Sequence, residues 1–208
     1  MNRAALFALL LVGGCGPLVQ IGGNVARPEA LYTISAAYPA PAPAGAISAG
    51  QPPVGQPPVD MTKAVSIDVP QVPGALQTLR IPVVVSDTSI QYVREASWAE
   101  QPNRLFQRLL ADTLVNSGIA VIDQRSSGKA GGRRLTGQLK AFGADVRDGR
   151  LVRVRFDATL IGPDGVRQRR FEHDAPVARI DGAHVSAALN SAANAVAADV
   201  SRWIGSSD

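Results

Sequence analysis

The 208-residue chain has one cysteine, two histidines and few aromatic residues, which make up 5% of the sequence. A single cysteine cannot form an internal disulfide framework, so the fold must depend on its apolar core. Because 46% of the residues are hydrophobic, that core is expected to consist mainly of Val, Leu, Ile and Ala. The formal net charge is +4, and the sequence contains no run of five residues of like charge. This mild, scattered excess argues against a nucleic-acid-binding protein.

The apolar run at the start of the chain is too short to span a bilayer. It covers nine residues, Ala4 to Val12, after Arg3, whereas a membrane-spanning helix needs about twenty. A run of this length fits the hydrophobic region of a secretory signal. The segment Val12-Gly13-Gly14-Cys15 follows and resembles the bacterial lipobox, with variants where Leu and then Ala or Ser are commonest.

The lipobox predicts cleavage before Cys15, so residues 1–14 are expected to be a lipoprotein signal peptide. The Cys15 thiol would receive a diacylglyceryl group and its freed amine a third acyl chain, such as palmitate. Each buried methylene contributes about 0.8 kcal/mol, so three chains form a lasting anchor. The alternative is a free cysteine in a signal that is cleaved elsewhere. Gly16, in place of Asp, favours sorting to the outer membrane over the inner membrane.

Residues 15–60 are predicted to be the acylated N-terminus and a linker. The stretch from Tyr38 to Val59 contains seven prolines and no charged residue. Such a composition favours extended polyproline conformation, which acts as a semi-rigid spacer. The alternative is a loop insertion, because the β-prone residues 31–35 could pair on a sheet edge before it.

Residues 61–208 are predicted to form one folded domain. Extended segments are expected at 65–69, 79–85, 89–94 and 119–123, with Pro82 marking an edge or irregular strand. A helix is expected to begin at the capping box Ser97–Glu100 and to end at 116–118. Glycine and serine then predict a loop over 125–134.

The second half of this domain alternates clearly between apolar and polar residues. Three strands are expected, at 135–146, 151–161 and 166–177, with turns at 148–149 and 163–165. The middle strand alternates apolar and polar residues, as in an antiparallel sheet with one wet side. Asp181 is expected to cap a final helix over about 183–204. The predicted fold class is therefore α+β, a mainly antiparallel sheet with two helices packed on one face.

No set of residues predicts catalysis or metal binding. Glu172, His173 and Asp174 are adjacent, but neighbours on a strand point to opposite faces and cannot converge on one ion. His184 lies near a helix start, and the glycines at 128–132 lack the ending of a phosphate-binding loop. We therefore expect no enzyme, no metal and no cofactor beyond the acyl groups on Cys15.

Ten basic residues fall on the three-strand region or its loops, with Arg153 and Arg155 on the wet face of its middle strand. These two residues could contact phospholipid head groups or an acidic partner. The alternative is a solvated face on which Asp157 and Glu172 balance them.

Several segments together resemble the family of ABC-type transport auxiliary lipoproteins. They are the lipobox, VSIDVPQVPGALQT at 65–78, IPVVVSDTSIQYVREASWAE at 81–100, the helix residues Leu-Leu-Ala-Asp-Thr-Leu, and LNSAANAVAADVSRWIG at 189–205. The similarity spans nearly all of residues 31–204, although the Pro-rich segment is longer than the family leads us to expect. Only Cys15 matches a functional position of the family, the lipid-attachment site.

The resemblance implies a periplasm-facing accessory of an ABC transporter with an MCE-type (mammalian cell entry) substrate-binding protein. Such systems move phospholipids or related lipids between the inner and outer membranes of Gram-negative bacteria. The implied partners are the MCE-domain protein, the permease and ATPase, the membrane, and further copies of this chain in a ring. The alternatives are a structural or assembly lipoprotein of the envelope and, with less support, a periplasmic hydrolase.

Overall fold

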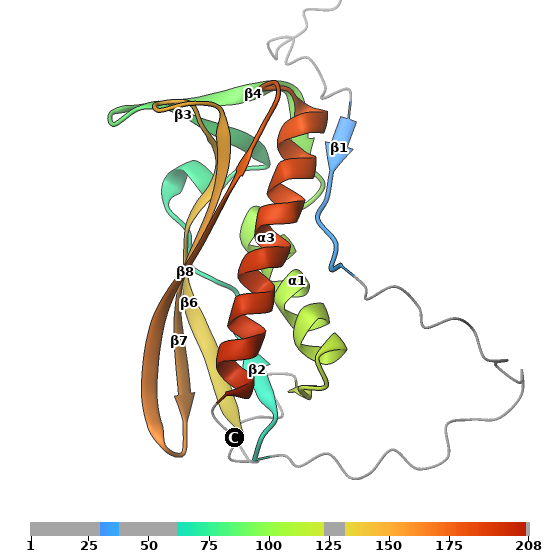
Figure 1. Ribbon diagram of the computed structural model, residues 1–208, viewed down its shortest axis with the longest axis vertical. Helices are drawn as coiled ribbons and strands as arrows, with labels where there is room; N and C mark the ends of the chain where they lie inside the picture. Colours follow the sequence, from blue (N-terminus) through green and yellow to red (C-terminus); the bar gives the residue numbers. More distant parts are fainter. Residues whose placement is uncertain (1–29, 38–61, 123–131, 207–208) are drawn as a thin grey trace, which may run out of the picture.

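Three long antiparallel strands form the main part of the sheet (Figure 1). They are β6 (Arg133–Asp145), β7 (Leu151–Gly162) and β8 (Gly165–Pro176). The computed structural model describes residues 30–37, 62–122 and 132–206. Within β7, the side chains at 152, 154, 156, 158 and 160 are buried and their neighbours are more exposed. The alternating strand and both turns are therefore confirmed, with bounds that differ by one or two residues.

Five shorter strands complete an eight-stranded sheet. They are β1 (Ala30–Tyr32), β2 (Val65–Ile67), β3 (Arg80–Ser86), β4 (Ser89–Trp98) and β5 (Val121–Ile122), with a 3-10 turn η1 at Gly74–Leu76. At one end of β6, β3 pairs beside it in parallel and leads outward to β4 and β1. At the other end of β6, β2 and then β5 lie alongside. The parallel pairings are short and the antiparallel ones long, so the sheet is mainly antiparallel, as predicted.

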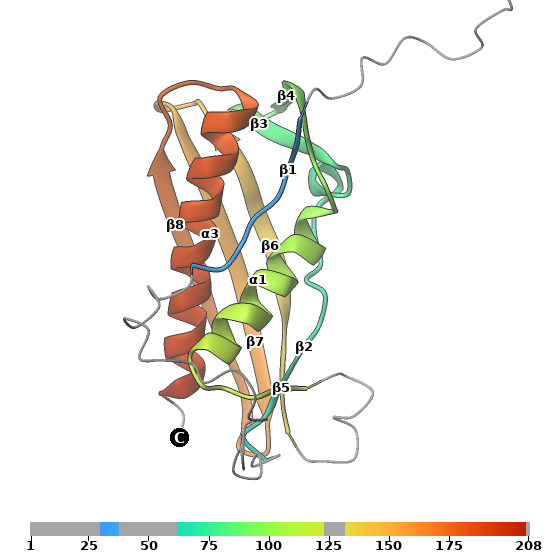
Figure 2. The ribbon, with the colours of Figure 1, turned by 90° about the vertical axis from the view of Figure 1, so that its right-hand side faces the viewer.

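Two helices cover one face of the sheet (Figure 2). Helix α1 spans Pro102–Asn116 and helix α3 spans Gly182–Gly205. The Asp181 carboxylate caps α3 by accepting a hydrogen bond from the backbone N–H of His184 at 2.9 Å. Phe106 of α1 packs edge-on against Phe156 of β7, with ring centroids 5.2 Å apart. No helix among these described residues has the length and apolar character needed to cross a membrane.

The predicted start of the first helix is wrong. Ser97 does not cap a helix but pairs with Arg80 across β3 and β4, and Trp98 is the last residue of β4. The helix begins later, at Pro102, where a residue without an N–H fits because the first helical amides have no intrahelical acceptor. Trp98 nevertheless belongs to the core, fully buried beside Phe142.

The β-prone segment near residue 31 does join the sheet. It forms β1, which pairs in parallel with β4 at the sheet edge. The chain then crosses toward α3, where the Ser35 N–H donates to Asn190 Oδ1 and the Asn194 side-chain amide donates to the Ser35 carbonyl, each at 2.9 Å. Ile34 and Ala36 are buried. Residues 30–37 thus belong to the folded unit, while the predicted signal peptide, Cys15 and the Pro-rich segment lie outside the described residues.

Pro82 marks an irregular strand, as expected, although β3 is not at the edge of the sheet. The register of β3 against β4 shifts between Arg80 and Pro82, and β3 also pairs with β6. A Cβ at Gly143 of β6 would lie 2.5 Å from the Pro82 carbonyl oxygen and 2.7 Å from its ring. The two strands can therefore approach only because residue 143 has no side chain.

This contact predicts that Gly143→Ala destabilises the protein. The added methyl group would press on backbone, which cannot move aside as a side-chain tip can, so we expect a loss of about 1–3 kcal/mol in the free energy of unfolding. Urea denaturation measures it. Gly74→Ala is the matched control, since a Cβ there meets no atom within 4 Å; equal destabilisation by both substitutions would contradict the prediction.

Candidate functional site

The side of β6, β7 and β8 that faces away from the helices is called here the polar face. Directly opposite residues on β7 and β8 carry opposite charges: Arg153 faces Asp174, Arg155 faces Glu172 and Asp157 faces Arg170. Opposite charges in such cross-strand positions attract at short range. The polar face is therefore an ordered set of pairs and not a random mixture of charged side chains.

Each of these three pairs is held by two hydrogen bonds. The Arg153 guanidinium donates to both oxygens of Asp174, at 2.8 and 2.7 Å. Arg155 donates to both oxygens of Glu172, at 2.5 and 3.0 Å, and Arg170 to both oxygens of Asp157, at 2.6 and 3.0 Å. Such two-point contacts fix geometry as well as charge, because the guanidinium and the carboxylate are both planar.

A further group of charges closes the end of the polar face next to the β3–β4 hairpin. Asp145, at the end of β6, is only 7% exposed. It accepts hydrogen bonds from Arg147 at 3.0 and 2.6 Å and from Arg153 at 3.4 Å. Arg147 also donates to Asp87 in the turn of the β3–β4 hairpin, at 2.6 Å. Ion pairs therefore connect the β6–β7 turn with the β3–β4 turn.

These pairs lower the pKa of the carboxyl groups that take part. The hydrogen bonds from Arg147 lower the pKa of Asp145, and the bond from Arg170 lowers that of Asp157. In the same way Arg155 lowers the pKa of Glu172 and Arg153 that of Asp174. In each case burial opposes the shift but is the smaller effect. All four groups are thus favoured in their charged form at neutral pH.

Arg153 and Arg155, predicted to contact head groups or a partner, lie on this face as expected. Asp157 and Glu172, the residues expected to balance them, also lie there, and Glu172 pairs with Arg155. The pairing with Asp174 could have been found from sequence, because the two-residue turn between Gly162 and Gly165 fixes the register of the whole hairpin. Contact with head groups stays a prediction, and both guanidiniums would have to exchange protein partners or share them.

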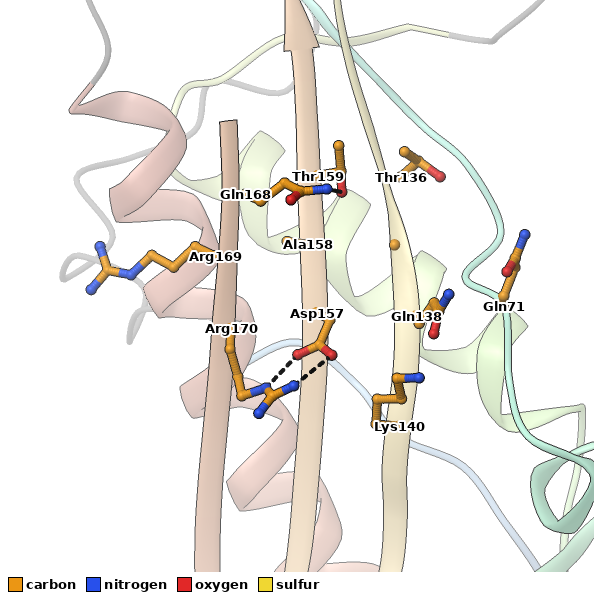
Figure 3. Close-up of a pocket in the computed structure, with 11 residues that line it drawn as sticks. Gln71, Thr136, Gln138, Lys140, Asp157, Ala158, Thr159, Gln168, Arg169 and Arg170 are labelled. Carbon is orange, nitrogen blue, oxygen red and sulfur yellow. Dashed lines mark hydrogen bonds and ion pairs between the residues drawn. The ribbon is translucent and has the colours of Figure 1, made fainter. Parts of the chain in front are cut away.

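A shallow polar hollow of about 630 Å³ lies farther along the polar face (Figure 3). Its lining combines uncharged polar side chains, namely those of Gln71, Thr136, Gln138, Thr159 and Gln168, with Lys140 and the Asp157–Arg170 pair. Gln168 donates to the Thr159 hydroxyl at 3.3 Å. The lining offers hydrogen bonds in both directions but no nucleophile paired with a base. Such a lining is suited to binding a polar surface.

The remaining candidates do not converge. His173 points to the helix side, where Nε2 lies 2.8 Å from Asp199 Oδ2, while Glu172 and Asp174 point to the polar face. His184 Nδ1 contacts Asp181 at 2.8 Å, beside the cap of α3. Within residues 30–37, 62–122 and 132–206, no three metal-ligating side chains lie together. Cys15 lies outside the described residues.

The depressed carboxyl pKa values predict that the protein loses stability in acid. The unfolded chain, with ordinary carboxyl pKa values near 4, takes up protons before the folded protein does. The stabilisation is complete above that pH and falls as the pH drops through it toward the lower folded-state pKa values. Urea denaturation between pH 7 and pH 3 should show the loss.

Asp174→Asn should lower the free energy of unfolding at pH 7 and make its decline in acid shallower, since one linked carboxyl is gone. Asp112→Asn, on the exposed side of α1 with no ion pair in the described chain, is the control and should follow the wild type. A decline that is equally steep in wild type and Asp174→Asn would contradict the role of this pair.

Known structures share this fold at low sequence identity. The crystal structure of XCC0632 from Xanthomonas campestris, a DUF330 protein, matches with a TM-score of 0.60 and 20% identity, over 70% of this chain and 87% of that one. A second crystal structure, of an uncharacterized protein, matches with a TM-score of 0.61 and 17% identity, over 69% and 93%. No curated protein matches the sequence. The family model for ABC-type transport auxiliary lipoprotein components matches residues 46–201, and the chain belongs to that family.

Proposed function

We propose that the protein is a periplasm-facing accessory of an MCE-type ABC transporter that carries lipids between the inner and outer membranes. The observation that carries the proposal is the family match across residues 46–201, because membership implies association with an ABC transporter. The lipobox-like segment before Cys15 supports attachment of three acyl chains and exposure to the periplasm. The contribution of the protein would be to dock or stabilise the lipid-conducting assembly rather than to catalyse a reaction.

The polar face supports a docking role. Its charges are already fixed in two-point pairs, so a partner would meet an ordered surface and little side-chain freedom would be lost on binding. A rigid surface of alternating charges gives orientation and selectivity more than raw affinity. Further copies of the chain, arranged in a ring, are part of the same proposal.

The position of the first described residue supports one orientation at the membrane. Strand β1, which begins at Ala30, lies at the end of the molecule that carries the β3–β4 hairpin, and α3 ends at the opposite end (Figure 1). Cys15 and Ala30 are fifteen positions apart in the sequence, a length that reaches at most about 50 Å when fully extended. The hairpin end would then be the nearer one to the outer membrane, the membrane that Gly16 favours.

A structural or assembly lipoprotein of the envelope is the second candidate. The polar hollow favours it, because amide and hydroxyl side chains such as those of Gln138, Thr159 and Gln168 suit the amide and hydroxyl groups of the cell wall. Binding of the full chain to isolated cell wall, lost in Gln138→Ala and kept without the transporter, would support this candidate over the first.

The docking proposal predicts that the full-length lipoprotein, purified from native membranes with a C-terminal tag, brings the MCE-domain protein, permease and ATPase with it. Mass spectrometry identifies these components. A tagged, unrelated lipoprotein from the same membrane is the control for shared membrane fragments. Recovery of the lipoprotein without any transporter component would contradict the proposal.

Lipidation of Cys15 makes a separate prediction. The mature N-terminal peptide should begin at Cys15 and carry a diacylglyceryl group and an amide-linked acyl chain, as its mass would show. Cys15→Ala should abolish both modifications and release the folded domain from the outer-membrane fraction in a gradient, because the acyl chains supply the anchor. An unmodified Cys15 in the wild-type peptide would contradict the prediction.

A further inference from the structure

An apolar groove of about 220 Å³ adjoins the polar face beside the β3–β4 hairpin. One wall comes from Pro82, Val84 and Ile90 of the hairpin, and η1 contributes Leu76. The floor is β6 at Ala141 and Gly143, where the small side chains leave the backbone uncovered. Ile90 is 48% exposed, so the groove is open to solvent on its hairpin side.

The ion pairs explain why this groove is not filled. On β7, Arg153 and Arg155 lie directly opposite Gly143 and Ala141 of β6, respectively. Both arginine side chains line the groove. The Arg153 guanidinium is held between Asp174 of β8, at 2.7 Å, and Asp145 at the end of β6, at 3.4 Å, and that of Arg155 is held by Glu172 of β8. The Arg153 and Arg155 side chains form the second wall, and Asp145 and Arg147 also line the groove. The groove is apolar inside and charged at its rim.

Lys140 is a rim residue that forms no such two-point pair within the described chain, although its charge helps to lower the pKa of Asp157. It is an exposed residue at the irregularity in β6 between Leu139 and Ala141, and it lines the groove. Among the residues that the structure describes, no carboxylate forms an ion pair with it. A ligand in the groove would therefore bind more tightly if it placed a negative charge of its own next to the Lys140 ammonium.

We propose that the groove is a docking pocket for a protein segment that inserts one large apolar side chain beside a carboxylate. The volume is below the 300–1,000 Å³ or so that is typical of small-molecule sites, but it is suited to a single anchoring side chain. An apolar centre within a polar rim that excludes water is the usual arrangement of a binding hot spot. The inference rests on the proposed function, since the segment would belong to the periplasmic MCE-domain component.

Two substitutions test the pocket within the full-length lipoprotein in its native membrane. Ile90→Asp places a charge in the apolar wall, and Lys140→Glu reverses the charge at the rim. Each should reduce the co-purified MCE-domain protein at least about tenfold, the loss expected at a hot spot. Lys140→Arg should retain it. Val166→Asp is the matched control for Ile90→Asp, because Val166 is likewise an exposed apolar residue (63%), but it lies in β8 next to the β7–β8 turn and does not line the groove.

A photoreactive benzoylphenylalanine in place of Ile90 identifies the occupant. The expected product is a crosslink to the MCE-domain protein, absent when the same group replaces Val166. A crosslink to phospholipid, a crosslink to a second copy of the chain, or no crosslink would each overturn the inference. If wild type recovers the transporter but the two substitutions do not reduce it, the pocket is refuted and the proposed function stands. If the wild-type protein recovers no transporter component, the proposed function is contradicted, and with it the pocket that rests on it.

Discussion

The sheet depends on how β6 divides the hydrogen bonds of its two edges. One edge pairs with β7 along nearly its whole length, whereas the other is shared between β2 at its start and β3 at its end. Between these, the Gln71 amide donates to the Gly137 carbonyl at 3.0 Å and the Leu139 amide donates to the Gln71 carbonyl at 2.9 Å. Buried backbone N–H and C=O groups need hydrogen-bond partners. On this edge of β6 the partners come from β2, from Gln71 and from β3, which lie far from β6 in the sequence.

The same division creates the surfaces that we interpret as functional. When β3 joins the far end of β6, the β3–β4 hairpin is placed against Gly143 and forms the wall of the apolar groove. Where residues 68–72 follow the middle of β6, Gln71 borders the polar hollow. The ion pairs between β7 and β8 then separate the two, because they draw the arginine side chains toward the edge strand. Arg153 and Arg155 therefore shape this surface through their pairs with Asp174 and Glu172.

Local sequence patterns predicted the parts of the fold that local physics determines. Alternation in β7 and the short turn at Pro163–Asp164 give the hairpin and its register, and Asp181 gives the start of α3. The predicted helix cap at Ser97 is wrong because Ser97 pairs with Arg80 in the sheet, and this pairing outweighs the local preference for a helix start.

Long-range pairing explains what the sequence did not reveal. Arg153 and Arg155 were placed on the correct face, but neither the hollow nor the groove has a local signature. Both arise where β6 meets segments of the chain more than fifty residues away, as in the pairing of Val83 with Ala144. The small residues Ala141 and Gly143 form the floor of a groove only because the β3–β4 hairpin lies beside them. No short motif in the sequence predicts that contact.

The segment of residues 30–37 has a mechanical consequence for an anchored protein. Any tension on the amino-terminal side enters the domain at Ala30 and first loads the short β1–β4 ladder and the amides of Asn190 and Asn194. Few bonds hold this segment, in contrast to the twelve register pairs that join β7 to β8. If Cys15 is acylated as we propose, this segment would separate from the sheet under tension before the central strands do.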